Sequence, residues 1–198
     1  VALAVLLVAG AWVAWFWQHP VADNLYAELS LAWIPRFGIS VYLSLDGLSL
    51  MLVALTLAMG VVAVVSSWTE TTVRHGFFQF NLLWTLAGVV GVFTALDLFL
   101  FFVFWEVMLI PMYFLISIWG TGRRQYSAMK FVMFTFLGSA FMLVGILALF
   151  FSTGTFDMTE LPAAIQAGAL VLPAGLIFAL LFIGFAVKLP VWPLHTWL

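Results

Sequence analysis

Long apolar segments separated by short polar ones make up most of the chain. Runs with almost no charged residue predict helices over residues 1–17, 46–68, 77–96, 98–119, 127–151 and 168–188. A helix needs about 17–25 apolar residues to cross a bilayer, and these runs are of that size. We therefore expect an all-α integral membrane protein, a polytopic bundle of about six transmembrane helices, forming one membrane domain over residues 1–198.

Polar residues and prolines mark where the predicted helices begin and end. Asp46 and Asp97 stand where N-caps are expected, and Asp97 leaves almost no loop between the helices it separates. Residues 19–44 and 152–168 are predicted to be polar loops. The last helix meets LPVWP at 189–193, and two prolines so close together should end or bend it. We expect residues 189–198 to be a broken segment.

Composition excludes several classes of protein. Hydrophobic residues make up 66% of the chain and charged residues 7%, against about 25% charged in soluble domains. A net charge of −2 without a basic patch argues against nucleic acid as a partner. With no cysteine, the chain can hold neither a disulfide nor a thiolate-bound iron–sulfur cluster. Because the sequence starts with Val1 and stops in apolar sequence, we expect a fragment of a longer protein.

Basic residues favour one side of the membrane. The second and fourth predicted loops carry Arg74, Arg123 and Arg124, with Lys130 just beyond, whereas the first, third and fifth carry only Arg36. The positive-inside rule places the basic loops in the cytoplasm, so residue 1 is expected to start on that side.

Glu106 is the acidic residue most deeply set in an apolar run. It lies nine residues past Asp97, or roughly 14 Å along a helix, and therefore near the bilayer midplane. Ionisable residues at this depth usually mark ion or proton paths, although a lone buried carboxyl could also stay neutral and only support packing. Pro111 frees the carbonyl of Val107, which leaves an acceptor beside Glu106.

Two lysines are further candidates. Lys188 ends an apolar stretch just before Pro190, which frees the carbonyl of Ala186, and the end of a half-helix favours a cation. Counted from Leu170, however, it lies about 27 Å along a helix, which would make it a lysine that snorkels to the surface. Snorkelling is also the simpler interpretation of Lys130. The three histidines are scattered, so a metal or haem site built by this chain alone is not expected.

Four stretches resemble the antiporter-like membrane subunits of respiratory complex I. They are residues 33–40 (WIPRFGIS), 45–50 (LDGLSL), 104–116 (FWEVMLIPMYFLI) and 185–198 (FAVKLPVWPLHTWL). The Trp-Glu and Ala-Val-Lys-Leu-Pro motifs occur across the wider antiporter-like family, and the first stretch points to one branch of the complex I subunits. The resemblance spans nearly the whole chain.

The resemblance implies a fold of two inverted five-helix repeats, each with a broken helix, of which this chain would hold one broken helix near Lys188 and Pro190. One helix before residue 1 and the C-terminal half would be missing. It also implies that Glu106 and Lys188 form a coupled pair in a proton half-channel, with Lys130 a basic residue near the pair. The family break lies inside the membrane, so the last helix must start nearer Gln166 or tilt.

The function implied is proton translocation in the membrane arm of NADH:quinone oxidoreductase, driven by quinone reduction elsewhere. The chain itself would bind no cofactor and perform no redox step; NADH, FMN, iron–sulfur clusters and quinone would belong to other parts of the complex. Its partners would be neighbouring antiporter-like subunits and the lipid of a bacterial inner membrane. Two alternatives stay open: a subunit of a Na⁺/H⁺ antiporter or ion-pumping hydrogenase, and a membrane scaffold that does not pump.

Overall fold

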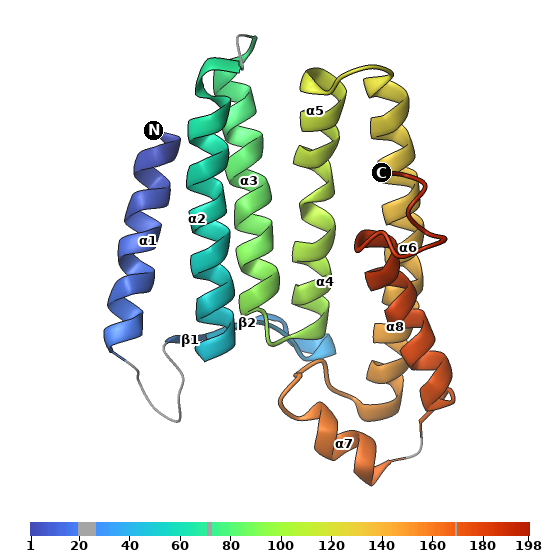
Figure 1. Cartoon of the computed structure of the whole chain (residues 1–198). Helices are drawn as coiled ribbons and strands as arrows, with labels where there is room; N and C mark the ends of the chain where they lie inside the picture. The colour runs from blue at the N-terminus through green and yellow to red at the C-terminus, as the bar shows by residue number, and fades with distance from the viewer. Residues whose placement is uncertain (20–26, 71–72, 169) are drawn as a thin grey trace.

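The computed structural model describes residues 1–19, 27–70, 73–168 and 170–198, which form an elongated helical bundle (Figure 1). Within the described residues, four helical spans are long and apolar enough to cross a membrane, over Gly47–Thr69, His75–Thr94, Leu98–Trp119 and Arg124–Thr153. Two apolar helices are shorter. The helices are α1 (Ala2–Gln18), α2 (Gly47–Glu70), α3 (His75–Thr94), α4 (Leu98–Val107), α5 (Leu109–Trp119), α6 (Arg124–Thr153), α7 (Leu161–Ala167) and α8 (Ala174–Lys188).

Two of the helices expected from the sequence differ in their bounds. The helix expected over 98–119 is interrupted at Met108 and so divides into α4 and α5. The helix expected over 168–188 begins only at Ala174, after an N-cap at Pro173. Proline disfavours helical geometry in the residue before it, which explains the later start. The loop expected over 152–168 contains the short helix α7, which also has a proline in its first turn.

We expected a purely α-helical chain with a loop over residues 19–44. This expectation is wrong for the later part of that segment, which forms two β-strands. Strands β1 (Ala27–Ile34) and β2 (Ile39–Leu45) pair antiparallel. A 3₁₀ turn joins them and ends at Gly38, whose φ of 68° is one that glycine adopts without strain. The part of the predicted loop at residues 20–26 lies outside the described residues.

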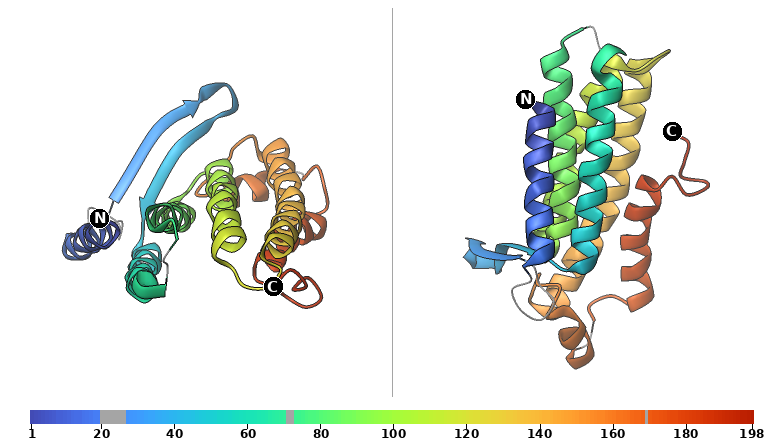
Figure 2. Two further views of the ribbon diagram at one scale, coloured as in Figure 1. Left: turned by 90° about the horizontal axis from the view of Figure 1, so that it is seen from above. Right: turned by 60° about the vertical axis from the view of Figure 1, so that its left-hand side comes forward.

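The hairpin lies across one end of the bundle and extends past α2 and α3 toward α4 (Figure 2). Trp33 near its tip contacts Phe99 of α4, with 6.4 Å between ring centroids. The basic residues of the α2–α3 and α5–α6 loops lie at the opposite end (Figure 1). The two ends of the bundle therefore differ in charge and in structure.

Asp97 joins three separate segments of the chain at the hairpin end. Its carboxylate, in a residue 1% exposed, accepts from the main-chain N–H groups of Phe99 and Leu100, so the predicted N-cap of α4 is confirmed. It also accepts from the N–H of Ser40 in the hairpin at 3.0 Å. Main-chain bonds of its two neighbours complete the junction, from Leu98 N–H to the Phe156 carbonyl and from the Met158 N–H to the Leu96 carbonyl.

Glycines bring α6 and α8 into close contact. A Cβ placed on Gly138 of α6 would lie 2.8 Å from the Cβ of Val187, and one on Gly184 of α8 would lie 2.6 Å from the Cβ of Met142. Without a strong hydrophobic force between helices in lipid, van der Waals contact through small residues holds such helices together. This contact fixes the position of the C-terminal end of α8 against α6.

We predict that Gly184→Ala destabilises the protein, because the added methyl group overlaps the Cβ of Met142. Overpacking of this kind typically costs about 1–3 kcal/mol. Heating the detergent-solubilised protein and following helicity by circular dichroism should show a lower midpoint. Gly175→Ala is the control, since nothing lies within 4 Å of its added Cβ. An equal fall in both variants would contradict this account of the α6–α8 contact.

We predict a larger loss of stability for Asp97→Ala than for Asp46→Ala, the exposed cap of α2. Removing Asp97 leaves three N–H donors without their acceptor, and we expect a cost of about 2 kcal/mol or more. Asp46 accepts from the Ser49 N–H at 2.7 Å, and its loss should cost about 1 kcal/mol or less. Thermal unfolding of the two variants under identical conditions measures the difference.

The pH dependence of the Asp46 cap provides a control for the comparison of Asp97→Ala with Asp46→Ala. The Ser49 main-chain N–H holds the pKa of Asp46 below its ordinary value. The stability that this carboxylate contributes is therefore complete above the ordinary pKa and is lost as the pH falls through the lowered one. Asp46→Ala should consequently match the unmodified protein more closely under strongly acidic conditions than at neutral pH.

Candidate functional site

The interruption at Met108 places a carboxylate beside a helix end. Glu106 lies in the last turn of α4, and α5 starts at Leu109. Pro111 is fully buried and has no N–H to donate to the Val107 carbonyl, as the sequence predicted. The last carbonyls of a helix have no intrahelical partner, so the end of α4 offers main-chain acceptors close to Glu106 in the sequence.

Glu106 is half-buried and turns toward α6 and α8. The hydroxyl of Ser139, in a residue 2% exposed, faces its carboxyl group, and the charge of Lys188 acts on it. One of its oxygens, Oε1, is buried without a hydrogen-bond partner in the described structure. A buried polar atom in this condition has capacity for a proton or a water molecule.

Lys188 is the last residue of α8, and its side chain reaches the end of α4. The Nζ atom donates to the main-chain carbonyl of Trp105 at 3.1 Å. It also lies 4.1 Å from the centroid of the Trp105 ring. The C-terminal end of a helix favours a cation, so α8 itself stabilises the ammonium group.

The residues after Lys188 satisfy the carbonyls at the end of α8. The Leu189 and Val191 N–H groups donate to the Phe185 and Ala186 carbonyls at 2.8 and 2.9 Å. The indole Nε1–H of Trp197 donates to the Val187 carbonyl at 2.8 Å. The Ala186 carbonyl, which Pro190 was predicted to free, is thus paired by the chain beyond the break.

The late start of α8 determines the depth of Lys188. Measured from Leu170, this lysine was expected either near the surface or, from the family resemblance, within the membrane. Because α8 has 15 residues and begins at one end of the bundle, it ends about halfway along α6 (Figure 1). Its contact with Trp105, the eighth residue of the 22-residue span Leu98–Trp119, agrees with that depth.

Lys130 lies away from Glu106 and holds the C-terminal segment instead. Its Nζ donates to the carbonyl of Thr196 and lies 5.9 Å from the ring centroid of Phe134. On the next position of α6, Phe131 contacts Trp197, with 5.2 Å between centroids. The structure therefore brings Lys188 to Trp105, the residue next to Glu106, and places Lys130 against the segment that closes the end of α8.

Two residues of the site were not identified from the sequence. They are Trp105, which contacts Lys188, and Ser139 of α6. Ser139 follows Thr135 by four residues, and both are buried. Two hydroxyl residues on one face of an apolar helix are a signal that could have indicated this position.

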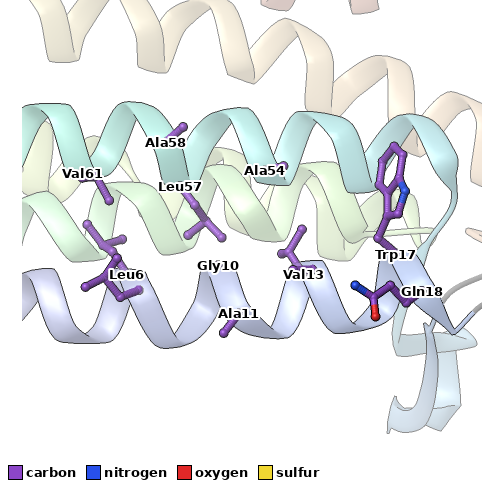
Figure 3. Close-up of a pocket in the computed structure, with 12 residues that line it drawn as sticks. Leu6, Gly10, Ala11, Val13, Trp17, Gln18, Ala54, Leu57, Ala58 and Val61 are labelled. Carbon is purple, nitrogen blue, oxygen red and sulfur yellow. The ribbon is translucent and has the colours of Figure 1, made fainter.

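No group of three potential metal-binding side chains occurs among the described residues. A groove of about 640 Å³ lies between α1 and α2 and is lined almost entirely by apolar groups such as Leu57 and Val61 (Figure 3). Neither Glu106 nor Lys188 lines it. The groove is therefore separate from the residues where α4 and α8 end.

We predict that Lys130→Met loosens the C-terminal segment, since the Thr196 carbonyl loses its donor. Amide hydrogen exchange in residues 191–198 should become roughly threefold to tenfold faster, as expected for loss of one hydrogen bond. Arg124→Met is the matched control, because Arg124 donates to the Ile118 carbonyl at the other side of the α5–α6 turn. Unchanged exchange in Lys130→Met would show that this lysine does not hold the segment.

Sequence comparisons identify relatives along most of the chain. It is 49% identical over 183 residues to NADH-quinone oxidoreductase subunit M of Escherichia coli K12, which covers 87% of this chain and 35% of that protein. It is 44% identical over 189 residues to NAD(P)H-quinone oxidoreductase chain 4 1 of Synechococcus elongatus, covering 92% of this chain and 34% of that protein. The chain thus spans about a third of the length of these relatives.

Solved structures and a family model agree with these relatives. Respiratory complex I from Thermus thermophilus contains a chain with a TM-score of 0.79 and 27% identity, covering all of this chain and 42% of that one. A chain of the Mrp complex from Dietzia sp. has a TM-score of 0.83 but 21% identity, which shows the fold alone; the match covers 100% of this chain and 22% of that one. Residues 95–198 match the family described as "NADH:quinone oxidoreductase/Mrp antiporter, TM". The chain is therefore a multi-pass membrane protein that belongs to this family.

Proposed function

We propose that this chain is part of a proton-translocating membrane-arm subunit of NADH:quinone oxidoreductase, the counterpart of subunit M. The observation that carries the proposal is the meeting of α4 and α8, where Lys188 donates to the carbonyl of Trp105, the residue next to Glu106. Ionisable groups within the membrane are costly, and in membrane proteins they usually serve ion or proton transfer. The identity of 49% to subunit M supports the assignment.

The mechanism rests on coupling between the two charges. While the Lys188 ammonium is close, it favours the ionised Glu106 carboxylate. When Lys188 passes its proton onward or moves away, Glu106 takes up a proton more readily, because the neighbouring positive charge has gone. Return of the charge would expel that proton. Quinone reduction elsewhere in the complex would drive the alternation, and this chain would carry out no redox step.

The finer architecture belongs to the same proposal. The interruption of α4–α5 and the end of α8 at Lys188 support a broken-helix fold of the antiporter-like kind, with the rest of the inverted repeats outside this chain. Arg74, Arg123 and Arg124 at one end support a cytoplasmic location for that end in a bacterial inner membrane. Neighbouring antiporter-like subunits and lipid would be its partners, and NADH, FMN, iron–sulfur clusters and quinone would bind elsewhere.

A subunit of a cation/proton antiporter is the second candidate, because the description of the matching family also names the Mrp antiporter. The same carboxylate and ammonium could exchange a cation for a proton. Sequence identity favours the first proposal, since it is 44–49% to the quinone oxidoreductase subunits and 21% to the Mrp chain.

We predict that Glu106→Gln in the intact complex lowers the protons moved per NADH oxidised on the order of tenfold, because the amide cannot take up and release a proton. Proton uptake into sealed inverted vesicles, measured together with NADH oxidation, tests this. Glu160→Gln is the control, as Glu160 is exposed and bonded to Thr155 in a loop. Unchanged pumping with Glu106→Gln would remove this residue from the path and favour a scaffold that does not pump.

A further inference from the structure

The ring of Trp105 lies against the ammonium group of Lys188, which the proposed mechanism moves. The main chain of this residue accepts the hydrogen bond of Lys188, and its ring presents a face 4.1 Å from the same nitrogen atom. Phe101 stacks on the Trp105 ring at 5.6 Å, and Phe185 of α8 meets it edge-on at 5.3 Å. The two phenylalanines leave the Trp105 ring little freedom to rotate away from Lys188.

The distance to the ring indicates a cation–π interaction. An ammonium group within about 6 Å of a ring centroid is attracted by the negative face of the ring, and tryptophan attracts it most strongly. The other lysine–aromatic and arginine–aromatic pairs that the described chain forms are longer, with 5.9 Å for both Lys130–Phe134 and Arg36–Phe37. Lys188 is also partly buried, and loss of water strengthens the attraction.

Lys188 therefore has two competing sites on adjacent residues of α4. One is the ring and carbonyl of Trp105, and the other is the carboxylate of Glu106, whose direction differs by about 100° around the helix. A lysine has a flexible four-carbon stem and three donors, so rotation of its side chain can move the ammonium between them. In the structure the hydrogen bond goes to Trp105, while Glu106 acts on Lys188 through its charge.

We propose that Trp105 is a positioning residue whose ring face and carbonyl form a resting site for the Lys188 ammonium, in competition with the Glu106 carboxylate. This inference rests on the proposed proton-transfer function of the pair. The resting site limits how long the ion pair between Lys188 and Glu106 lasts. Weakening it should leave the ion pair in place for longer, so Glu106 would take up protons more slowly.

Fluorinated tryptophan at position 105 tests the electrostatic part without changing the shape of the ring. Each added fluorine withdraws electron density from the ring face and weakens cation–π attraction. We expect the rate of NADH-driven proton translocation by the intact complex to fall stepwise with the number of fluorine atoms, by about twofold to tenfold at the end of the series. The control series is fluorinated Trp119, whose Nε1–H donates to the Val73 carbonyl far from Lys188.

A flat response at position 105, or the same response at both positions, would overturn the proposal. Substitutions provide a second measurement: Trp105→Phe should retain more pumping than Trp105→Leu in equally assembled complexes, because only the phenylalanine keeps a ring face. Equal loss in both would also overturn it. If Glu106→Gln abolishes pumping while the fluorine series is flat, the role of Trp105 fails and the proposed function stands. If Glu106→Gln leaves pumping unchanged, the proposed function itself fails.

Discussion

An ammonium group inside an apolar helical bundle needs oxygen acceptors. The free-energy cost of transferring it out of water is far larger than the stabilisation from contacts with the surrounding hydrocarbon. Regular helices cannot supply these acceptors, since each main-chain carbonyl is already bonded within the helix. Helix ends can, because their last carbonyls have no partner in the helix. In this protein α4 and α8 end beside each other, and Lys188 at one end donates to a carbonyl at the other.

The rest of the bundle keeps these two ends in register. On one side, Gly138 and Gly184 bring α8 against α6, so the depth at which α8 ends is set by close contact. On the other side, Asp97 fixes the start of α4 and therefore the height at which Glu106 lies. The glycine contact lies within about one turn of Lys188, whereas Asp97 lies nine residues, about two and a half turns, before Glu106.

The sequence predicted the parts of this arrangement that depend on local chemistry. Asp97 as an N-cap and the end of the last helix at Lys188 both follow from spacing and from proline. The hairpin was missed although polar and apolar residues alternate over residues 28–31, because high polarity in the surrounding segment suggested a loop. The partners of Lys188 and Lys130 could not be predicted, since both contacts join residues that are distant in sequence.

The junction at Asp97 also sets an order for synthesis. The hairpin leaves the ribosome early, yet Ser40 binds a carboxylate that comes 57 residues later, and the main chain around Asp97 pairs with residues 156 and 158. Until α2, α3 and α4 have entered the bilayer, the hairpin lacks the helices that it packs against, and its strand edges stay open to other chains. The hydrogen bonds at this end of the protein are therefore complete only after residues 156 and 158 have been made.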